Sequence, residues 1–296
     1  MLFSNATVVK LSSPLPEDLE TKLLTHTFEG VSNYARSSIG WVPLLDVPEA
    51  PLTRAYGQRL LFCGRREEKV IPMSAVTEAV QARVSKQESL DGQKLTATAK
   101  RSIKDDVMAE MLPRALCKSK RILIYHDPAL KALILNTGIE NEVEDLLNLL
   151  RASIGSLNVY RWDGGASIGL FTQWLTHKTL PEALTLGAEC SLFDPESTAR
   201  ITWRGQSLDA SELLTHLDHG KRCERLQLIW NGAIKFTLDK HLTLRGLRTV
   251  AFEDDPEDAV DEDEDNLYSV LDREYALLSE SLALLVPLIE TTVVQH

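Results

Sequence analysis

An Asn-Gly pair between two apolar runs constrains the fold of this chain more than any other short segment. Leu226–Trp230 precedes Asn231-Gly232, and Ala233–Leu238 follows it. Asn-Gly between apolar runs favours a type I′ turn, whose twist matches that of two paired antiparallel strands. The segment therefore predicts a β-hairpin, and residues 242–252 are expected to continue its sheet.

Strands and helices are interleaved along the rest of the chain without the regular period of βαβ units. β-branched or apolar runs predict strands, and apolar residues at helical spacing predict helices. The expected strands cover residues 7–11, 59–63, 122–125, 132–135, 159–161 and 199–203. The expected helices cover residues 17–24, 74–87, 99–112, 141–154, 211–218 and 267–290, with Gly155 as a cap and Pro287 as a late kink. This order predicts an α+β fold with mixed or antiparallel sheets and long helices.

These elements divide the chain into five predicted segments. Residues 1–73 together with 117–165 form a central sheet domain, and residues 74–116 form a helical extension. Residues 166–252 form a second α+β domain. An acidic loop over 253–266 and a C-terminal helix over 267–296 follow it.

Charge is sorted into separate zones. The formal net charge is −11, yet ten acidic residues and no basic one lie between Glu253 and Asp265. The whole chain has 32 basic and 43 acidic residues, so the body without these ten is nearly neutral. Between Lys94 and Ile122 eight basic residues face three acidic ones. A net acidic protein sorted in this way can still present a positive surface to a polyanion.

Length and composition are those of a globular protein with a substantial core. The chain has 296 residues, 44% hydrophobic and 25% charged. It shows no signal-peptide pattern and no apolar run of the roughly 18 residues that a membrane span needs, so we expect a cytoplasmic protein without membrane contact. Four widely spaced cysteines are expected to be buried or partly buried free thiols. They are Cys63, Cys117, Cys190 and Cys223.

Motifs for catalysis or cofactor binding are lacking in the sequence. Gly164-Gly165 with Gly169 lacks the lysine and the strand-to-helix context of a phosphate-binding loop. His216, His219 and Cys223 resemble metal ligands in spacing, but no second cluster completes a zinc site. The acidic block is expected to be a solvated loop, because ten like charges repel one another. We therefore expect no enzyme activity, no metal and no cofactor.

The basic zone fits a surface for the phosphates of DNA. Counterion release drives sequence-independent binding where several Lys or Arg side chains share one surface. Such a surface could extend across a helix and the turn after it. Its members would be Lys100, Lys104, Arg114, Lys118 and Arg121. A second candidate is the segment 200–206, where basic residues flank Trp203. An ordinary solvated face is the alternative for both.

Several segments resemble the RdgC family of recombination-associated proteins. They run in the family's order over nearly the whole chain, and their co-linear combination carries the resemblance. The segments are Gly40–Pro43, Arg66–Lys69, Ile71-Pro72, Leu112–Ala115, Leu149–Leu157, Thr172–Trp174, the region of Gln206, and Leu228–Trp230.

The resemblance implies a ring-shaped homodimer whose basic central hole encircles duplex DNA without sequence preference. It also implies a nucleoid-associated protein that restrains the RecA recombinase by occupying DNA, and that has no catalytic activity. Leu116 occupies the position of one dimer contact of the family, and Arg204 and Gln206 match a second one. The family has an aromatic residue at the position of Leu116 and a second basic residue at the position of Gly205. These two departures predict a weaker or differently packed interface, which would affect closure of the ring more than affinity for DNA.

The leading hypothesis is a non-enzymatic, sequence-tolerant ring dimer on duplex DNA. The residues predicted to contact DNA are Lys100, Lys104, Arg114, Lys118, Arg121, Arg66, Lys69, Arg204 and Gln206. One alternative is an interaction protein that contacts the recombinase directly through its acidic residues 254–265. A second alternative is a metal-dependent nuclease.

Overall fold

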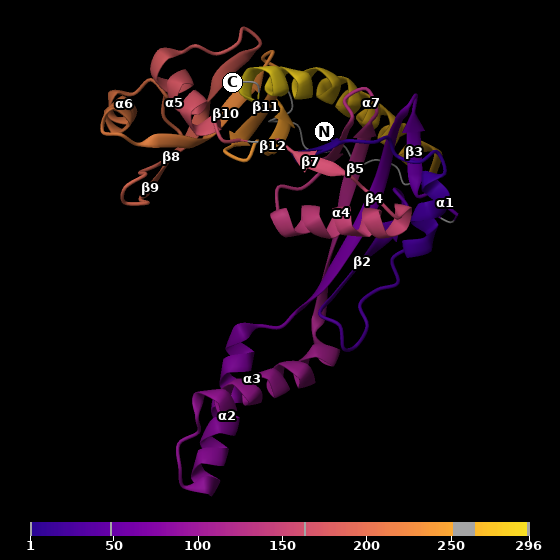
Figure 1. The fold of residues 1–296 in the computed structure, drawn as a ribbon, viewed down its shortest axis with the longest axis vertical. Helices are drawn as coiled ribbons and strands as arrows, with labels where there is room; N and C mark the ends of the chain where they lie inside the picture. Colours follow the sequence, from indigo (N-terminus) through magenta and orange to yellow (C-terminus); the bar gives the residue numbers. More distant parts are fainter. Residues whose placement is uncertain (1, 48, 163, 251–263, 295–296) are drawn as a thin grey trace.

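In the part of the chain that the structure describes, twelve antiparallel strands form one sheet (Figure 1). The computed structural model describes residues 2–47, 49–162, 164–250 and 264–294. The strands follow the order β2-β4-β5-β6-β1-β12-β11-β10-β8-β9, with β3 paired to β4 and β7 paired to β1. Their bounds are β1 Asn5–Leu11, β2 Ser37–Val42, β3 Thr53–Tyr56, β4 Arg59–Val70, β5 Leu116–Asp127, β6 Ala132–Leu135, β7 Val159–Arg161, β8 Leu184–Phe193, β9 Arg200–Trp203, β10 Arg222–Trp230, β11 Ile234–Asp239 and β12 Leu244–Thr249.

Seven α-helices accompany this sheet in the described residues. Their bounds are α1 Leu19–Leu23, α2 Met73–Asp91, α3 Ala97–Met111, α4 Glu140–Ile154, α5 Ser167–His177, α6 Ser211–Asp218 and α7 Glu264–Ile289. The predicted α+β class with antiparallel pairing is confirmed, and each predicted helix lies close to its expected position. Gly155 ends α4 with a φ of 85°, as its predicted capping role requires. The proposed division into domains stays a prediction.

The Asn-Gly hairpin is confirmed. Strands β10 and β11 pair from Arg225 opposite Asp239 to Trp230 opposite Ile234. Asn231 and Gly232 both have positive φ angles, 49° and 66°, as a type I′ turn demands. The Ala233 N–H donates to the Trp230 carbonyl at 2.9 Å and closes the turn.

Strand β1 joins two half-sheets into one. Its residues Thr7 to Lys10 pair with β6, whereas Asn5 and Ala6 pair with β12. The first half contains β2 to β6 with β1 and β7, and the second half contains β8 to β12. β1 is buried from Ala6 to Leu11, because neighbouring elements cover both of its faces.

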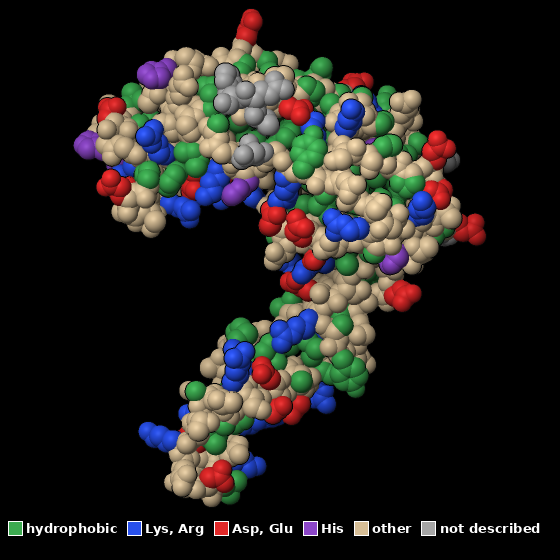
Figure 2. Space-filling model, viewed as in Figure 1, with side chains coloured by type: hydrophobic (Ala, Val, Ile, Leu, Met, Phe, Trp, Pro, Cys, Tyr) green, Lys and Arg blue, Asp and Glu red, His purple; other side chains and the backbone are tan. Residues whose placement is uncertain are grey.

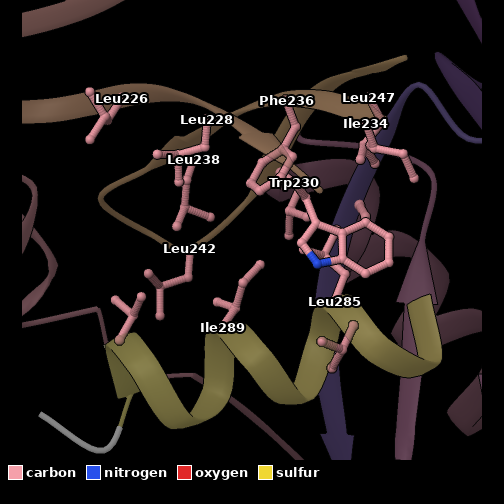
Figure 3. Close-up of a cluster of buried hydrophobic side chains, with 14 of the residues drawn as sticks. Leu226, Leu228, Trp230, Ile234, Phe236, Leu238, Leu242, Leu247, Leu285 and Ile289 are labelled. Atoms are coloured by element: carbon pink, nitrogen blue, oxygen red, sulfur yellow. The ribbon is translucent and has the colours of Figure 1, made fainter. Parts of the chain in front are cut away.

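Helix α7 packs along one face of both half-sheets. Tyr275 meets Tyr125 of the first half edge to face, with ring centroids 6.0 Å apart. Figure 3 shows Leu285 and Ile289 packed beneath Trp230 and the other apolar side chains of β10 and β11. One buried cluster therefore extends through both halves.

Ion pairs fix α7 near both of its ends. Arg54 of β3 donates from Nε to Asp272 Oδ1 at 2.8 Å. Lys10 of β1 contacts Glu290, just past the helix, at 2.8 Å, and it also donates to the Leu130 carbonyl. Pro287 does not end the helix; α7 continues to Ile289 and passes into a π-helical turn over Glu290–Val294.

Helix α4 covers the opposite face of the first half-sheet. Leu146 and Leu150 of α4 are fully buried against Phe62 and Ile122. The contact is so close that a Cβ at Gly64 of β4 would overlap the Leu146 side chain. In the described part of the chain no helix covers the corresponding face of the second half-sheet (Figure 1).

Helices α2 and α3 form an arm that stands away from the sheet (Figure 1). Only four apolar side chains are buried in or beside it: Val76, Val84, Val107 and Leu112. Arg83 of α2 pairs with Glu110 of α3 from Nη1 to Oε1 at 3.0 Å. The arm therefore depends on few contacts, and its surface is largely polar.

Two expectations from the sequence need correction, one about a long apolar segment and one about a cysteine. Leu267–Val293 is long and apolar enough to cross a membrane by length and composition alone, contrary to the expectation that the sequence has no such run. Its residues Leu278 and Leu282 are fully buried in the core of the fold, as in a core helix. Cys117 is exposed, whereas the other three free cysteines are buried.

Replacing Leu282 by Ala tests the role of α7. The cavity left in the shared core should lower the free energy of unfolding by about 2–5 kcal/mol. Leu284→Ala is the matched control, because Leu284 lies on the same helix but is 64% exposed, and its cost should stay within about 0.5 kcal/mol. Urea denaturation measures both, and equal losses would contradict the packing described here.

Candidate nucleic-acid interface

The molecule is C-shaped, with a concave side between the second half-sheet and the α2–α3 arm (Figure 1). Helix α7 lies on the convex side and α4 on the concave side. Figure 2 shows Lys and Arg side chains along the concave edge, beneath the lobe of the second half-sheet and on the arm. Acidic side chains are interspersed with them where the arm meets the body.

The basic residues after the arm lie on a strand rather than in a turn. β5 begins at Leu116 and pairs along β4, with Arg66 opposite Lys120 and Arg65 opposite Arg121. Neighbouring residues of a strand point to opposite faces. Lys118 therefore shares the α4 face with Lys120, and Arg121 points to the other face. The expected turn after the helix is thus wrong: it is a strand, and Lys118 and Arg121 lie on opposite faces of it.

Protein partners already hold two basic side chains on the α4 face. Arg66 donates to Asp145 of α4 at 3.0 Å and also contacts Glu68. The hydrogen bond to Glu68 is the main cause that raises the pKa of Arg66. Lys120 pairs with the buried Glu142 of α4 at 2.7 Å. These charges neutralise one another at the base of the arm.

Arg121 and Lys69 tie loops to the sheet. Arg121 donates from Nη1 to Asp46 at 2.6 Å and from Nη2 to the Leu44 carbonyl at 2.9 Å. Lys69 donates to the Ser32 and Asn33 carbonyls at 2.8 and 2.7 Å. Both side chains therefore serve the fold; DNA contact by either stays a prediction.

The arm and the start of β5 just after it carry the predicted residues that are most available to a ligand. Lys100 pairs with Glu88 at 3.0 Å. The Leu95 N–H and then Lys100 lower the pKa of Glu88. Lys104, Arg114 and Lys118 are exposed and have no side-chain partner among the described residues. Of the five residues first grouped, these three keep an uncompensated charge.

The two predicted dimer contacts lie on different parts of the C. Arg204 and Gln206 follow β9 in the lobe of the second half-sheet, where Gly205 adopts a φ of 72°. Arg204 Nε lies 3.4 Å from Glu189, and Gln206 is exposed. Leu116 begins β5 beside the arm and is 82% exposed.

Basic residues that were not predicted as site residues lie on the uncovered face of the second half-sheet. Leu226 and Leu228 of β10 face α7, so Arg225 on the same strand faces the other way. Arg245 of β12 pairs opposite Thr237 and shares that face. Together with Arg204, they line a shallow hollow on the sheet. Alternation along β10 and β12 was the signal available in the sequence.

No group of three or more His, Cys, Asp or Glu side chains within the described residues could hold a metal ion. Cys223 is fully buried, and burial raises its pKa. His219 lies exposed at the end of α6 and contacts the Thr215 carbonyl.

Most of the acidic block, residues 253–263, lies outside the described residues, whereas Glu264 and Asp265 are the first residues of α7.

Comparisons with known proteins match nearly the whole chain. A family model described as "Putative exonuclease, RdgC" matches residues 1–295. The chain belongs to the RdgC family. It is 30% identical to the recombination-associated protein RdgC of Halorhodospira halophila over 92% of this chain and 90% of that protein. It is 33% identical to that of Proteus mirabilis over 80% of each chain, and 29% identical to that of Tolumonas auensis over 97% and 96%.

The relatives' names and the family model's description differ on enzyme activity. The curated RdgC proteins are named as recombination-associated proteins and not as enzymes, whereas the model's description contains the word exonuclease. The predicted membership in this family is confirmed over nearly the whole chain.

Arg121→Gln tests whether this side chain serves the fold. Loss of its bonds to Asp46 and to the loop carbonyls should lower the free energy of unfolding by about 1–3 kcal/mol. Lys118→Gln on the same strand removes the same charge from an exposed, unpaired side chain and should change stability by less than about 0.5 kcal/mol. Chemical denaturation distinguishes them; an unchanged Arg121→Gln would refute a structural role.

Proposed function

We propose that this RdgC homologue is a ring-shaped homodimer that encloses duplex DNA without sequence preference and restrains RecA-type recombination. The observation that carries this proposal is a set of exposed basic side chains that have no side-chain partner among the described residues. They are Lys104 of α3, Arg114 just after α3, and Lys118 of β5. Figure 2 shows Lys and Arg side chains on the arm and along the concave edge. A net charge of −11 does not oppose such binding, because DNA meets the local surface rather than the average charge.

Unpaired charge is what makes these three residues good phosphate ligands. An arginine already bonded to a carboxylate, such as Arg66, would have to lose that partner before it neutralised a phosphate. A solvated lysine such as Lys104 has no such competitor and releases the counterions of DNA on binding. Phosphate contacts carry no direct sequence information, which supports sequence-tolerant binding.

Exposed apolar side chains support a dimer contact beside the arm. Leu116 is paired opposite Val70 across β4 and β5, and the two are 82% and 46% exposed. In a two-fold dimer the same patch meets its own copy, so both side chains would leave water together. A second contact at Arg204 and Gln206, on the other part of the C, would close the ring around a central hole.

A ring on duplex DNA would restrain recombination by occupying the substrate of the recombinase. The names of the relatives, which associate RdgC proteins with recombination, support this role. We propose a nucleoid-associated protein of the cytoplasm that acts without a catalytic step.

Charge reversal on the arm and at the start of β5 tests DNA binding. The triple variant Lys104→Glu, Arg114→Glu and Lys118→Glu should weaken duplex binding and make the slope of log affinity against log salt about three units shallower. Arg273→Glu is the control, because Arg273 is exposed on α7 at the convex side. Fluorescence anisotropy with several duplex sequences measures both, and salt-independent binding by the wild type would sink the proposal.

The same samples test the nuclease alternative. Circular duplex DNA incubated with the wild-type protein and Mg²⁺ or Mn²⁺ should be recovered intact. Reproducible cleavage that purified with the protein would favour the activity in the family model's description.

Leu116→Asp tests the dimer. A carboxylate in the apolar contact should raise the protein concentration at half-dissociation by at least about tenfold, because a charge buried without a partner is costly. Leu284→Asp places the same change at an exposed leucine on α7 and should leave the dimer intact. Sedimentation velocity measures the association state. A wild-type protein that is a monomer and still binds DNA would contradict encirclement.

A further inference from the structure

A small pocket lies in the first half-sheet, between the end of β1 and the turn that joins β5 to β6. Its volume is about 240 Å³, and none of the described residues that line it belongs to the arm or to the predicted DNA contacts. Leu11 and His126 of its lining are buried, whereas Ser12, Ser13 and Lys131 are exposed. The pocket therefore has a closed side within the sheet and an open, polar side at the surface.

His126 is the polar group at the closed side. Ile124 belongs to the core under α4 and Tyr125 to the core under α7, so alternation along β5 places His126 on the α4 face. The residue is 6% exposed, and neither ring nitrogen has a hydrogen-bond partner among the described residues. Because nearly all buried polar groups in folded proteins are hydrogen-bonded, an unpartnered imidazole beside a cavity indicates a partner that enters the cavity.

The His126 ring has both a donor and an acceptor to offer. Burial lowers the pKa of His126, so the imidazole is neutral at pH 7. A neutral imidazole donates from one nitrogen and accepts at the other. A hydroxyl group, which also donates and accepts, can therefore pair with either nitrogen.

The open side of the pocket has a fixed backbone and a solvated cation. The Lys131 N–H donates to the Pro128 carbonyl at 3.2 Å, and the Lys131 carbonyl accepts from the Leu11 N–H at 2.7 Å. The Ser12 N–H donates to the Asn158 carbonyl at 3.0 Å. The Lys131 side chain is exposed and has no partner among the described residues. A ligand would thus meet a site whose backbone is already ordered.

No acidic side chain among the described residues lines the pocket. The nearest one in the sequence, Asp127, follows His126 on β5 and so points to the other face. Its Oδ2 accepts from the Tyr125 hydroxyl at 2.8 Å and lies 3.1 Å from Arg59 Nε. Because Arg59 balances this carboxylate, the Lys131 charge at the open side remains available to an anion.

We propose that the pocket binds a small aromatic acid that carries a hydroxyl group at the end opposite its carboxylate. The hydroxyl would pair with His126 at the closed side, and the carboxylate would meet Lys131 and the serine hydroxyls at the open side. The ring would lie between them against Leu11, Pro14 and Pro128, which supply the apolar part of the lining.

The volume of the pocket sets the size of this ligand. A cavity of about 150 Å³ holds benzene, so this larger pocket has room for one ring with two small substituents. Pockets for drug-sized ligands begin at about 300 Å³, which is larger than this one. This site goes beyond the proposed function, because it shares no residue with the proposed DNA or dimer contacts.

Titration calorimetry with 4-hydroxybenzoate tests the site. Benzoate lacks the hydroxyl and 4-hydroxybenzamide lacks the charge, so each should bind about two- to tenfold more weakly, the effect of one hydrogen bond or one exposed ion pair. His126→Phe should abolish the preference for 4-hydroxybenzoate over benzoate. Lys131→Gln should abolish the preference over 4-hydroxybenzamide. Lys86→Gln on α2 removes another exposed lysine and should keep both preferences.

Histidine-selective NMR locates the ligand, because the chain has only seven histidines. 4-Hydroxybenzoate should shift the one signal that is absent from His126→Phe. Lys131→Gln changes an exposed side chain, so it tests the anion half of the proposal even if His126→Phe does not fold. Absence of binding by the wild type, or equal affinity for all three compounds, would overturn the proposal and leave water as the partner of His126. DNA binding is measured separately, so neither result bears on the proposed function.

Discussion

The packing of α7 across both half-sheets is the interaction on which the rest of the structure depends. A sheet of this width has two faces, and this helix buries one of them along much of its length through Tyr275, Leu282 and Leu285. β1 contributes the hydrogen bonds that join the halves, while α7 contributes the shared apolar core. Because that face is buried in the core, only the opposite face of the sheet is accessible to a ligand.

Helix α4 covers the opposite face of the sheet over the first half only, and this decides which basic side chains on that face have an acidic partner. Over the first half, α4 brings Glu142 and Asp145 against Lys120 and Arg66, so basic residues there become parts of the fold. Over the second half, no such helix supplies acids among the described residues, and Arg225 keeps its charge. Whether a basic side chain already has a carboxylate partner in the protein, more than the number of basic residues, decides which side chains can bind a phosphate.

The sequence predicted turns and helix ends correctly where the conformational preference of one or two residues determines them. The Asn231-Gly232 turn and the Gly155 cap require positive φ angles that these residues adopt easily, and both were found as expected. Strands β2, β3 and β8 were not predicted, because they are short or contain Gly and polar residues, and pairing with their neighbours stabilises them. The local sequence of residues 116–121 is polar and predicts a turn, yet the segment is a strand that pairs along its whole length with β4.

The sequence by itself determined the α+β class, the central hairpin and the zones of charge, because each follows from residues close together in the chain. Only the tertiary structure decided which charges are available. Arg66 and Asp145 are 79 positions apart, and Arg245 and Gly138 are 107 apart, so no local pattern reveals that they meet. Strand alternation then separates Lys118 from Arg121, although only two residues lie between them, because a pleated strand sends odd and even positions to opposite faces.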